Sequence, residues 1–298
     1  MAGATVGVTG ADDRQPPSMD SFRRRVLAEG RLHWRDLPWR RTRDPYGVWV
    51  SEVMLQQTQV SRVDGRWQRW LARFPDPASL AAAETADVLS EWQGLGYNRR
   101  ALALQRAASE ICGRWGGRVP RDAADLVSLP GIGPATAAGI RAFAFDLPGV
   151  YLETNVRAVF LHEFFPDGEK VPDRVLVPLV EEACPEVGAR GWYYALLDYG
   201  AHLKRTVPNP SRRSAAHGRQ SAFEGSRRQK RAALVRLLLE AREVGAGGLA
   251  LEDAVASLGE QEAAKGRPEP AAGLVEELLE ELAAEGFCRR GDGMWSCR

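Results

Sequence analysis

Three features of this sequence could do chemistry: the glycine turn Leu129-Pro-Gly-Ile-Gly-Pro134 and two carboxylates, Glu52 and Glu153. The two glycines let the turn adopt backbone angles closed to other residues and let a partner approach the main chain closely. A helix predicted from Ala135 to about Phe145 follows the turn, and the unpaired N–H groups at such a helix start can bind a phosphate. The turn therefore predicts a main-chain phosphate site, with a plain corner between two helices as the alternative.

Glu52 lies in a predicted helix from Gly47 to Val63 whose other side chains are largely apolar, among them Val48, Trp49, Val53, Leu55 and Val60. Residues 54–59 carry no charge, so no local salt-bridge partner is expected. Burial disfavours the ionised form of a carboxyl group and raises its pKa, which suits a general acid. A solvated glutamate in mid-helix is the alternative.

Glu153 opens another predicted helix, over residues 153–165, with the run Glu153-Thr154-Asn155. A carboxylate at a helix N-terminus interacts favourably with the helix dipole, so a structural role alone could account for it.

Two further stretches combine aromatic side chains with cations or glycines. The connector Leu37–Tyr46 carries Trp39 and Arg40 between two prolines, and such side chains can stack on bases and pair with phosphates. A surface loop with a tucked tryptophan is the alternative. Tyr97 ends the turn Gly94-Leu-Gly-Tyr97 and could wedge into a base stack, whereas a tyrosine in the core is the alternative.

The net charge of +1 over 298 residues is unevenly distributed: it is −1 over residues 1–203, +9 over 204–236 and −7 over 237–298. The basic segment indicates a polyanionic partner. No apolar run is long enough to span a membrane, and residues 1–17 lack the apolar core of a signal peptide and are expected to be a disordered tail. Four scattered cysteines indicate thiols in a reducing cytoplasm and no metal cluster.

Helical periodicity runs through residues 18–203 with little strand signal, which predicts a mainly α fold. Residues 204–230 are polar and basic, and we expect them to form an irregular loop.

Residues 231–298 predict a separate small domain with the pattern of a winged helix. Three helices, Arg231–Arg242, Leu251–Leu258 and Ala271–Glu285, are followed by a hairpin that turns at Gly291-Asp-Gly293. The third helix holds no basic residue but five glutamates, Glu276, Glu277, Glu280, Glu281 and Glu285. In a DNA groove these would meet phosphates of like charge, so we expect a packing or protein-contact role.

The run Leu129-Pro-Gly-Ile-Gly is similar to the helix-hairpin-helix of the endonuclease III superfamily of DNA glycosylases. Four other motifs resemble adenine glycosylases of the MutY type: Ser51-Glu-Val-Met-Leu-Gln-Gln-Thr-Gln-Val60, Leu37-Pro-Trp-Arg40, Gly94-Leu-Gly-Tyr97 and Leu152-Glu-Thr-Asn-Val156. The resemblance covers about Met19 to Gly200. It implies a two-lobed helix-hairpin-helix core over 18–203 that flips a nucleotide out of double-stranded DNA into a pocket.

The resemblance also implies roles for single residues. Glu52 matches the acid that protonates the adenine ring, and Glu153, with Asn155, matches the site of a carboxylate that balances oxocarbenium charge on the sugar. The hairpin would hold a phosphate and can carry a monovalent cation on main-chain carbonyls, with no other metal expected. The remaining DNA contacts are predicted at Arg40, Gln56, Gln57, Thr58, Tyr97, Leu129, Gly131, Ile132, Gly133, Ala135, Thr136, Arg212 and Arg213.

The chain departs from the family pattern at its second carboxylate. The family has an aspartate 22 residues after the first hairpin glycine, and here that position is Glu153. The extra methylene moves the carboxylate by about 1.5 Å, and a misplacement of that order can cost about a hundredfold in rate.

The iron–sulfur ligands are a second departure. The four cysteines of the family correspond to Lys204, Ser211, Ser214 and Gln220, none of which supplies a thiolate, so no 4Fe–4S cluster or other cofactor is predicted. Ala135 stands where lyase-type relatives carry a lysine, so a monofunctional glycosylase is expected.

The function predicted on this basis is hydrolysis of the N-glycosidic bond of adenine opposite guanine or 8-oxoguanine. Because the β-rich domain that senses 8-oxoguanine is not visible, two alternatives stay open: excision of another base (thymine or uracil opposite guanine, or hypoxanthine), and a DNA-binding protein without activity. We expect a cytoplasmic, nucleoid-associated monomer that binds double-stranded DNA and no membrane, with a protein partner for the acidic helix.

Overall fold

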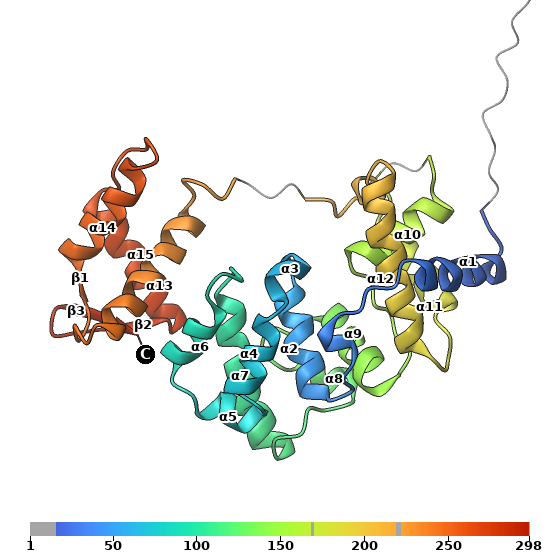
Figure 1. The fold of residues 1–298 in the computed structure, drawn as a ribbon, viewed down its shortest axis with the longest axis horizontal. Helices are drawn as coiled ribbons and strands as arrows, with labels where there is room; N and C mark the ends of the chain where they lie inside the picture. Colours follow the sequence, from blue (N-terminus) through green and yellow to red (C-terminus); the bar gives the residue numbers. More distant parts are fainter. Residues whose placement is uncertain (1–15, 168–169, 219–221, 298) are drawn as a thin grey trace, which may run out of the picture. The chain divides into compact units, whose positions relative to one another are not determined.

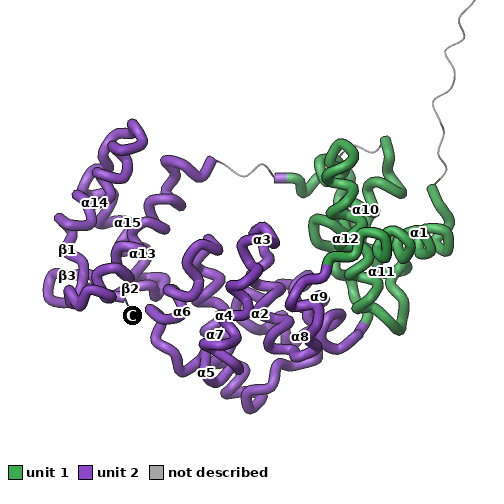
Figure 2. The backbone as a smooth tube through the Cα atoms, viewed as in Figure 1, with its two compact units in different colours: residues 1–35, 148–217 green, residues 36–147, 218–298 purple. Residues whose placement is uncertain are grey.

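The computed structural model describes residues 16–167, 170–218 and 222–297, so most of the predicted tail (residues 1–15) and Gln220 lie outside the described residues. The chain is mainly helical and forms two compact units (Figures 1 and 2). Unit 1 comprises the described residues up to Arg35 together with residues 148–217. Unit 2 comprises residues 36–147 and the described residues from Gly218 onward.

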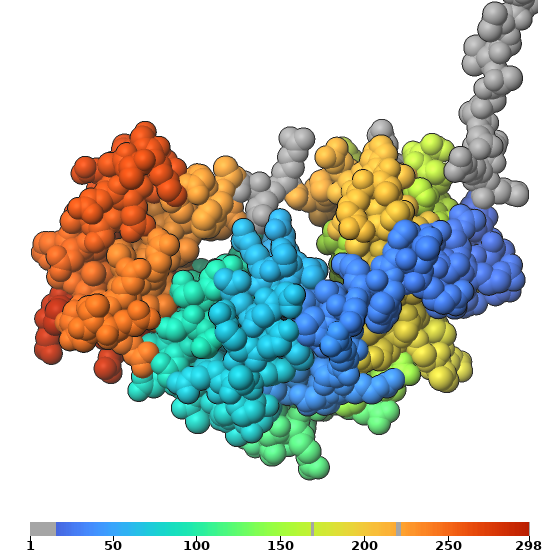
Figure 3. Space-filling model, viewed as in Figure 1, coloured from blue at the N-terminus to red at the C-terminus, as the bar shows by residue number. Residues whose placement is uncertain are grey.

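Unit 1 is a helical bundle formed by two stretches that are far apart in the sequence. Its elements are α1 (Met19–Leu32), α10 (Thr154–Phe164), α11 (Asp173–Ala183), α12 (Ala189–Thr206) and the 3₁₀ turn η2 (Pro210–Arg213). Phe22 packs on the rings of Phe160 and Phe164, with centroids 4.9 and 4.8 Å away. A Cβ on Gly30 would come within 2.5 Å of the Ala195 Cα and closer still to its Cβ, so no larger side chain fits there. α1 packs closely on α12, and the space-filling view shows the blue N-terminal segment against the gold one (Figure 3).

The first part of unit 2 is also helical and surrounds a tryptophan-rich core. Its elements are η1 (Pro38–Arg40), α2 (Pro45–Leu55), α3 (Val60–Val63), α4 (Arg66–Arg73), α5 (Pro77–Ala82), α6 (Thr85–Trp92), α7 (Arg99–Trp115), α8 (Ala123–Val127) and α9 (Pro134–Phe145). Trp49, Trp70 and Trp92 are fully buried there. α2 packs against α9, which places the predicted acid and the hairpin on neighbouring helices.

The helix predicted from Gly47 to Val63 is wrong in its extent, because the chain breaks between α2 and α3. Gln57 adopts a left-handed backbone with φ of 53°, which a helix interior does not allow. At the break, the Met54 carbonyl accepts from the side chain of Arg100, and the Val53 carbonyl accepts from Arg100 and from the Gln56 N–H.

The C-terminal part of unit 2 runs α13 (Arg227–Glu243), β1 (Leu249–Ala250), α14 (Leu251–Ala263), α15 (Ala272–Glu285), β2 (Cys288–Gly291) and β3 (Met294–Cys297). The predicted hairpin is confirmed: β2 and β3 pair antiparallel, and Asp292 and Gly293 both have positive φ, as a two-residue turn requires. β1 was not predicted; it pairs with β3 and completes a three-stranded sheet in the order β1-β3-β2. The winged-helix interpretation stays a prediction.

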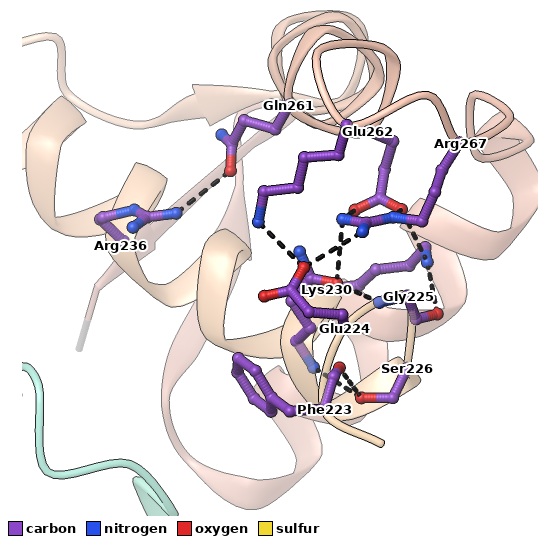
Figure 4. A network of polar contacts seen from close by, with 11 residues as sticks. Phe223, Glu224, Gly225, Ser226, Lys230, Arg236, Gln261, Glu262 and Arg267 are labelled. Atoms are coloured by element: carbon purple, nitrogen blue, oxygen red, sulfur yellow. Dashed lines mark hydrogen bonds and ion pairs between the residues drawn. The ribbon is translucent and has the colours of Figure 1, made fainter.

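The start of α13 lies four residues before the predicted Arg231, because Ser226 caps the helix by accepting from the Gln229 N–H. A polar network then ties this start to α14 (Figure 4). The Glu262 carboxylate accepts from Arg267 at 2.7 Å and from Lys230 at 3.4 Å, and the Arg267 hydrogen bond lowers the pKa of Glu262 to about 2. Part of the predicted basic loop is therefore a well-anchored helix.

Candidate active site

The glycine turn connects α8 to α9 as predicted. Gly131 has a φ of +77°, and a Cβ there would press on Ala103, so this position requires glycine on both counts. Leu129 and Ile132 are buried and anchor the turn, whereas Gly131, Gly133 and Ala135 are exposed. Gly133 is the N-cap of α9 and offers no side chain, and Pro134 has no N–H, so the N–H groups of Ala135 and Thr136 are the first donors of this helix without an intrahelical acceptor.

Glu52 lies in the middle of α2 and is half-buried rather than buried. One turn further on, Gln56 donates from Nε2 to the Thr136 hydroxyl on α9 at 3.0 Å, which links the end of α2 to the hairpin. Gln57 is exposed and Thr58 is half-buried within the break. Glu52, the predicted acid, thus lies within α2, and Gln56 and Gln57, the amides predicted to contact DNA, follow directly at the end of this helix.

Arg100, which sequence reasoning missed, organises this break. One guanidinium nitrogen, Nη1, donates to the carbonyls of Val53 at 2.8 Å, Met54 at 3.2 Å and Gln56 at 2.5 Å. The other, Nη2, donates to the Thr58 hydroxyl at 3.0 Å and to the carbonyls of the turn before Tyr97, those of Leu95 and Gly96. One side chain therefore joins both predicted DNA-probing segments, and burial lowers its pKa to about 10.

Tyr97 is 38 % exposed and has a φ of 50°, so it is not the core tyrosine of the alternative interpretation. Its ring faces the Arg100 guanidinium, 5.5 Å from the centroid. Trp39, by contrast, is the tucked tryptophan of the alternative interpretation, and Arg40 is buried with only 7 % exposed. Burial leaves the Arg40 guanidinium little surface for a phosphate, which argues against the DNA contact predicted there.

Glu153 is the N-cap of α10, in unit 1. Its carboxylate accepts from the N–H groups of Asn155 at 2.5 Å and Val156 at 2.8 Å, and from the Asn155 side-chain amide at 3.3 Å. The predicted helix start thus shifts by one residue, from Glu153 to Thr154. The two carboxylates, Glu52 and Glu153, belong to different units.

The electrostatic setting of Glu153 is mixed. Burial raises the pKa of its carboxyl above the ordinary value, while the Val156 N–H and the charge of Lys204 act in the opposite direction. Lys204 is itself partly buried, which lowers its pKa, although Glu153 opposes that shift. The charge of Lys204, the residue at the first predicted cluster position, thus acts on Glu153, and no pattern in the sequence indicates this.

Asn155 follows the cap, and its main chain lies directly against Gly200 of α12, where a Cβ would collide with the Asn155 carbonyl. α10 and α12 therefore approach closely at this point, which fixes the start of α10 and the carboxylate that caps it.

The loop after α12 is held by hydrogen bonds from the residues at two further cluster positions. Ser211 is buried and donates its hydroxyl to the Thr154 carbonyl at 3.2 Å. Ser214 is buried and its hydroxyl accepts from the Ala216 N–H at 3.1 Å, while its neighbours Arg213 and Ala215 bond to the main chain of Val171. Within the described ranges, no three or more His, Cys, Asp or Glu side chains gather as a metal site.

The two arginines predicted to bind DNA in this loop differ. Arg212 is exposed, as a phosphate contact requires. Arg213 instead donates to the main-chain carbonyls of Leu161 at 3.3 Å, Phe165 at 2.6 Å and Pro166, so it closes the C-terminal end of α10. This argues for a structural role of Arg213 rather than the predicted DNA contact.

Residues 50–183 match the model of the HhH-GPD superfamily of base excision DNA repair proteins. The matched range contains Glu52, the hairpin and Glu153. The part of the chain that holds the hairpin and both candidate carboxylates is therefore similar to helix-hairpin-helix base-excision proteins.

Curated relatives narrow the comparison to adenine DNA glycosylases. The chain is 46% identical over 126 residues to that of Mycolicibacterium smegmatis, a match covering 42% of this chain and 43% of the relative. It is 33% identical over 168 residues to that of Buchnera aphidicola, covering 56% and 48%. The human adenine DNA glycosylase is 39% identical over 155 residues, covering 49% and 28%. The matches thus span less than half the length of these relatives.

Solved structures confirm the fold. A thermostable thymine-DNA glycosylase aligns with a TM-score of 0.55 at 24% identity, covering 61% of this chain and 86% of that one. An endonuclease III in a non-covalent DNA complex aligns with a TM-score of 0.51 at 20% identity, covering 64% and 87%. Among the described residues, no helix combines the length and apolar character needed to cross a bilayer.

Proposed function

We propose that this protein is a base-excision glycosylase that hydrolyses the N-glycosidic bond of adenine in double-stranded DNA, opposite guanine or 8-oxoguanine. The observation that carries the proposal is that the segment matching the base-excision family retains both carboxylates, one inside α2 and one at the start of α10. The similarity to adenine DNA glycosylases supports adenine as the excised base.

In the proposed mechanism, Glu52 protonates the ring of the flipped adenine and makes it a better leaving group. As the bond to the sugar breaks, positive charge develops on the sugar, and the Glu153 carboxylate stabilises it. Water then adds to the sugar and leaves an abasic site. The N–H groups of Asn155 and Val156 support the ionised form of Glu153 that this role requires.

We further propose that the enzyme binds DNA through the exposed α8–α9 turn and works without an iron–sulfur cluster. The residues at three of the four cluster positions, Lys204, Ser211 and Ser214, do not fit such a cluster, since they offer an ammonium group and two hydroxyls already engaged in the loop. Ala135 leaves the hairpin without a lysine for Schiff-base chemistry, so base release is expected without strand cleavage.

The proposal is tested by single-turnover base release, followed by alkaline cleavage, on duplexes with adenine opposite guanine or 8-oxoguanine. Duplexes with thymine or uracil opposite guanine, and with hypoxanthine, complete the panel. Glu52→Gln should lower adenine release about 100- to 10,000-fold, because the amide cannot supply a proton. Glu91→Gln, a half-buried glutamate on α6, is the matched control and should not change the rate.

Unchanged release by Glu52→Gln would exclude the proposed mechanism. Release of another base would keep the mechanism and change the specificity. Tight duplex binding without release on any substrate would instead favour a DNA-binding protein without activity.

A further inference from the structure

The terminal hairpin brings two cysteines together. β2 and β3 pair antiparallel, and Cys288 lies directly opposite Cys297 in their register. Both side chains are free thiols in this structure. They belong to the same compact unit, and neither takes part in the reaction proposed above. The hairpin therefore presents a dithiol whose chemistry the proposed function does not use.

The register also fixes the kind of pair that the two cysteines form. In an antiparallel ladder, hydrogen-bonded pairs alternate with non-hydrogen-bonded pairs, and the side chains of the second kind lie closer together. The two-residue turn closes on the hydrogen-bonded pair Gly291–Met294. Cys288–Cys297 is the third pair beyond it and is therefore of the non-hydrogen-bonded kind, with Cα atoms about 4.5 Å apart. Disulfides span Cα distances of about 4.4–6.8 Å, so this pair can be bridged.

The two side chains lie on the same, packed face of the sheet, because directly opposed residues share a face. Cys288 is 2 % exposed, and Trp295, on the same face of β3 as Cys297, is equally buried. The Cys288 thiol donates to the Leu279 carbonyl of α15 at 3.7 Å. Cys297 is half-buried and packs against the same core.

This environment makes both thiols slow to react. Burial raises the pKa of Cys288 to about 12 and that of Cys297 to about 11. Because the thiolate is the nucleophile in disulfide exchange, little of either group is reactive near neutral pH. The half-buried Cys297 is the one that an oxidant reaches first, and the buried Cys288 lies directly opposite it.

We propose that Cys288 and Cys297 form a reversible disulfide when the protein meets a disulfide oxidant such as oxidised glutathione, and that this bond holds the terminal sheet closed. The Cys297 thiolate attacks one sulfur of the oxidant and releases the first glutathione thiolate. The Cys288 thiolate then attacks the Cys297 sulfur of the mixed disulfide and releases the second. The oxidant gains two electrons, and the protons of the two cysteines end on the two released thiols.

The bond would act on the central strand of the sheet. β3 lies between β1 and β2, so a cross-link to β2 also holds the strand that pairs with β1. A disulfide stabilises mainly by restricting the unfolded chain, so opening of the hairpin should become rarer after oxidation.

The first test incubates the full chain with oxidised glutathione, alkylates the remaining thiols and digests the protein with trypsin without reduction. Trypsin cleaves after Arg289 and Arg290, so Cys288 and Cys297 fall on separate peptides that stay joined only by a disulfide. We expect the joined peptides. Their rate of formation should rise about tenfold per pH unit between about pH 7 and pH 9, since the thiolate fraction grows by that factor below the pKa.

The second test compares amide hydrogen exchange in the reduced and oxidised protein. Exchange in β3 should slow about tenfold or more on oxidation, because the cross-link makes opening of the hairpin rarer. Exchange in α9, which lies outside the C-terminal sheet, should not change.

Single substitutions test the order of the two steps. Cys288→Ala should stop the reaction at the mixed disulfide of Cys297 with glutathione. Cys297→Ser should leave Cys288 unmodified, because that thiol is buried. Cys112→Ser and Cys184→Ser are the matched controls: both residues are half-buried cysteines outside the hairpin, and their loss should not change the yield of joined peptides.

A wild type that yields no joined peptides would overturn the proposal, as would separate mixed disulfides on both cysteines. Joined peptides without slower exchange in β3 would overturn the effect proposed for the sheet. None of these readouts needs DNA, so their outcome is independent of the proposed function.

Discussion

The end of α2 and the start of α10 are each held by a half-buried charged side chain, and the two side chains differ in what else they do. At the end of α2, the Arg100 guanidinium satisfies the last carbonyls of the helix that carries Glu52. At the start of α10, Glu153 satisfies the first N–H groups. Each charge has the sign that the helix dipole favours.

The two helix ends differ in whether the residue that holds the helix end is also the residue that takes part in the proposed reaction. In α2, the proposed acid and the group that shapes its helix are different residues. In α10, one carboxylate caps the helix and is also the proposed reacting group. Stability and rate should therefore respond separately to changes near α2 and together to changes at Glu153.

Among changes to the two side chains that hold these helix ends, the largest effect is expected from removing the charge of Glu153. Glu153→Gln keeps an oxygen that can accept from the α10 N–H groups but cannot stabilise a cationic sugar, so adenine release should fall about a hundredfold or more. Glu153→Ala loses the cap as well and should also lower the free energy of unfolding by about 1 kcal/mol. Single-turnover rates and thermal melts of the two variants separate these effects. Equal melting temperatures would show that the cap contributes no stability.

Glu153→Asp sharpens the same comparison, since aspartate is a good N-cap and its carboxylate is shorter by one methylene. We expect the variant to have the same melting temperature as the wild type. It should release adenine up to about a hundredfold faster, because a misplacement of the carboxylate by about 1 Å can lower the rate by that factor. A slower variant would mean that the site is built for glutamate.

A change at Arg100 should move Gln57 and Tyr97 and leave the pH dependence of the rate unchanged. Arg100→Ala takes the Arg100 donor from the Met54 carbonyl and one of two donors from the carbonyls of Val53, Gln56, Leu95 and Gly96. This loss should lower the free energy of unfolding by about 1–3 kcal/mol and the rate about tenfold through misplaced Gln57 and Tyr97. Arg100→Lys keeps the charge without the fork and should recover only part of the loss. The measurement is the pH–rate profile, whose midpoints should not move; a shifted profile would give Arg100 an electrostatic role in catalysis.

The smallest expected effect is a displaced acid limb in the wild-type pH–rate profile. Burial raises the pKa of Glu153, so its carboxylate becomes protonated, and the rate falls, at a pH above the 4.5 of an ordinary glutamate. Because the pKa is higher in the folded state than in the unfolded chain, the contribution of this group to stability is full at low pH and is lost as pH rises through the folded value. The melting temperature of the wild type, minus that of Glu153→Gln, should therefore fall as pH rises over that range. A limb at or below pH 4.5 would contradict this.

The sequence predicts the helices and the glycine turn well, because periodicity and turn chemistry are local properties. It misses the break after Leu55, since nothing in Gln56–Gln59 signals a left-handed residue; the cause is Arg100, more than 40 residues away. It finds both carboxylates but not the electrostatic influence of Lys204 on Glu153, which depends on α12 packing against α10.

The charge pattern was the least reliable guide to the site. The basic segment, residues 204–236, predicts a surface for DNA. In the structure, however, Arg227 and Arg231 form ion pairs with glutamates of α15, and Arg213 donates hydrogen bonds to main-chain carbonyls. A count of charges along the chain cannot show which of them neutralise one another after folding.

The close packing of α1 on α12 has a consequence during synthesis. Arg23 of α1 donates to the carbonyl of Ala183, 160 residues later in the chain, and Gly30 meets Ala195 beyond it. At a translation rate of about 5–20 residues per second, α1 must wait roughly ten to thirty seconds for this partner to emerge from the ribosome. Through that interval its apolar face, with Phe22 and Val26, is exposed as the rest of the chain is made. The apolar face of α1 is therefore a surface for a nascent-chain chaperone to cover until α12 is made.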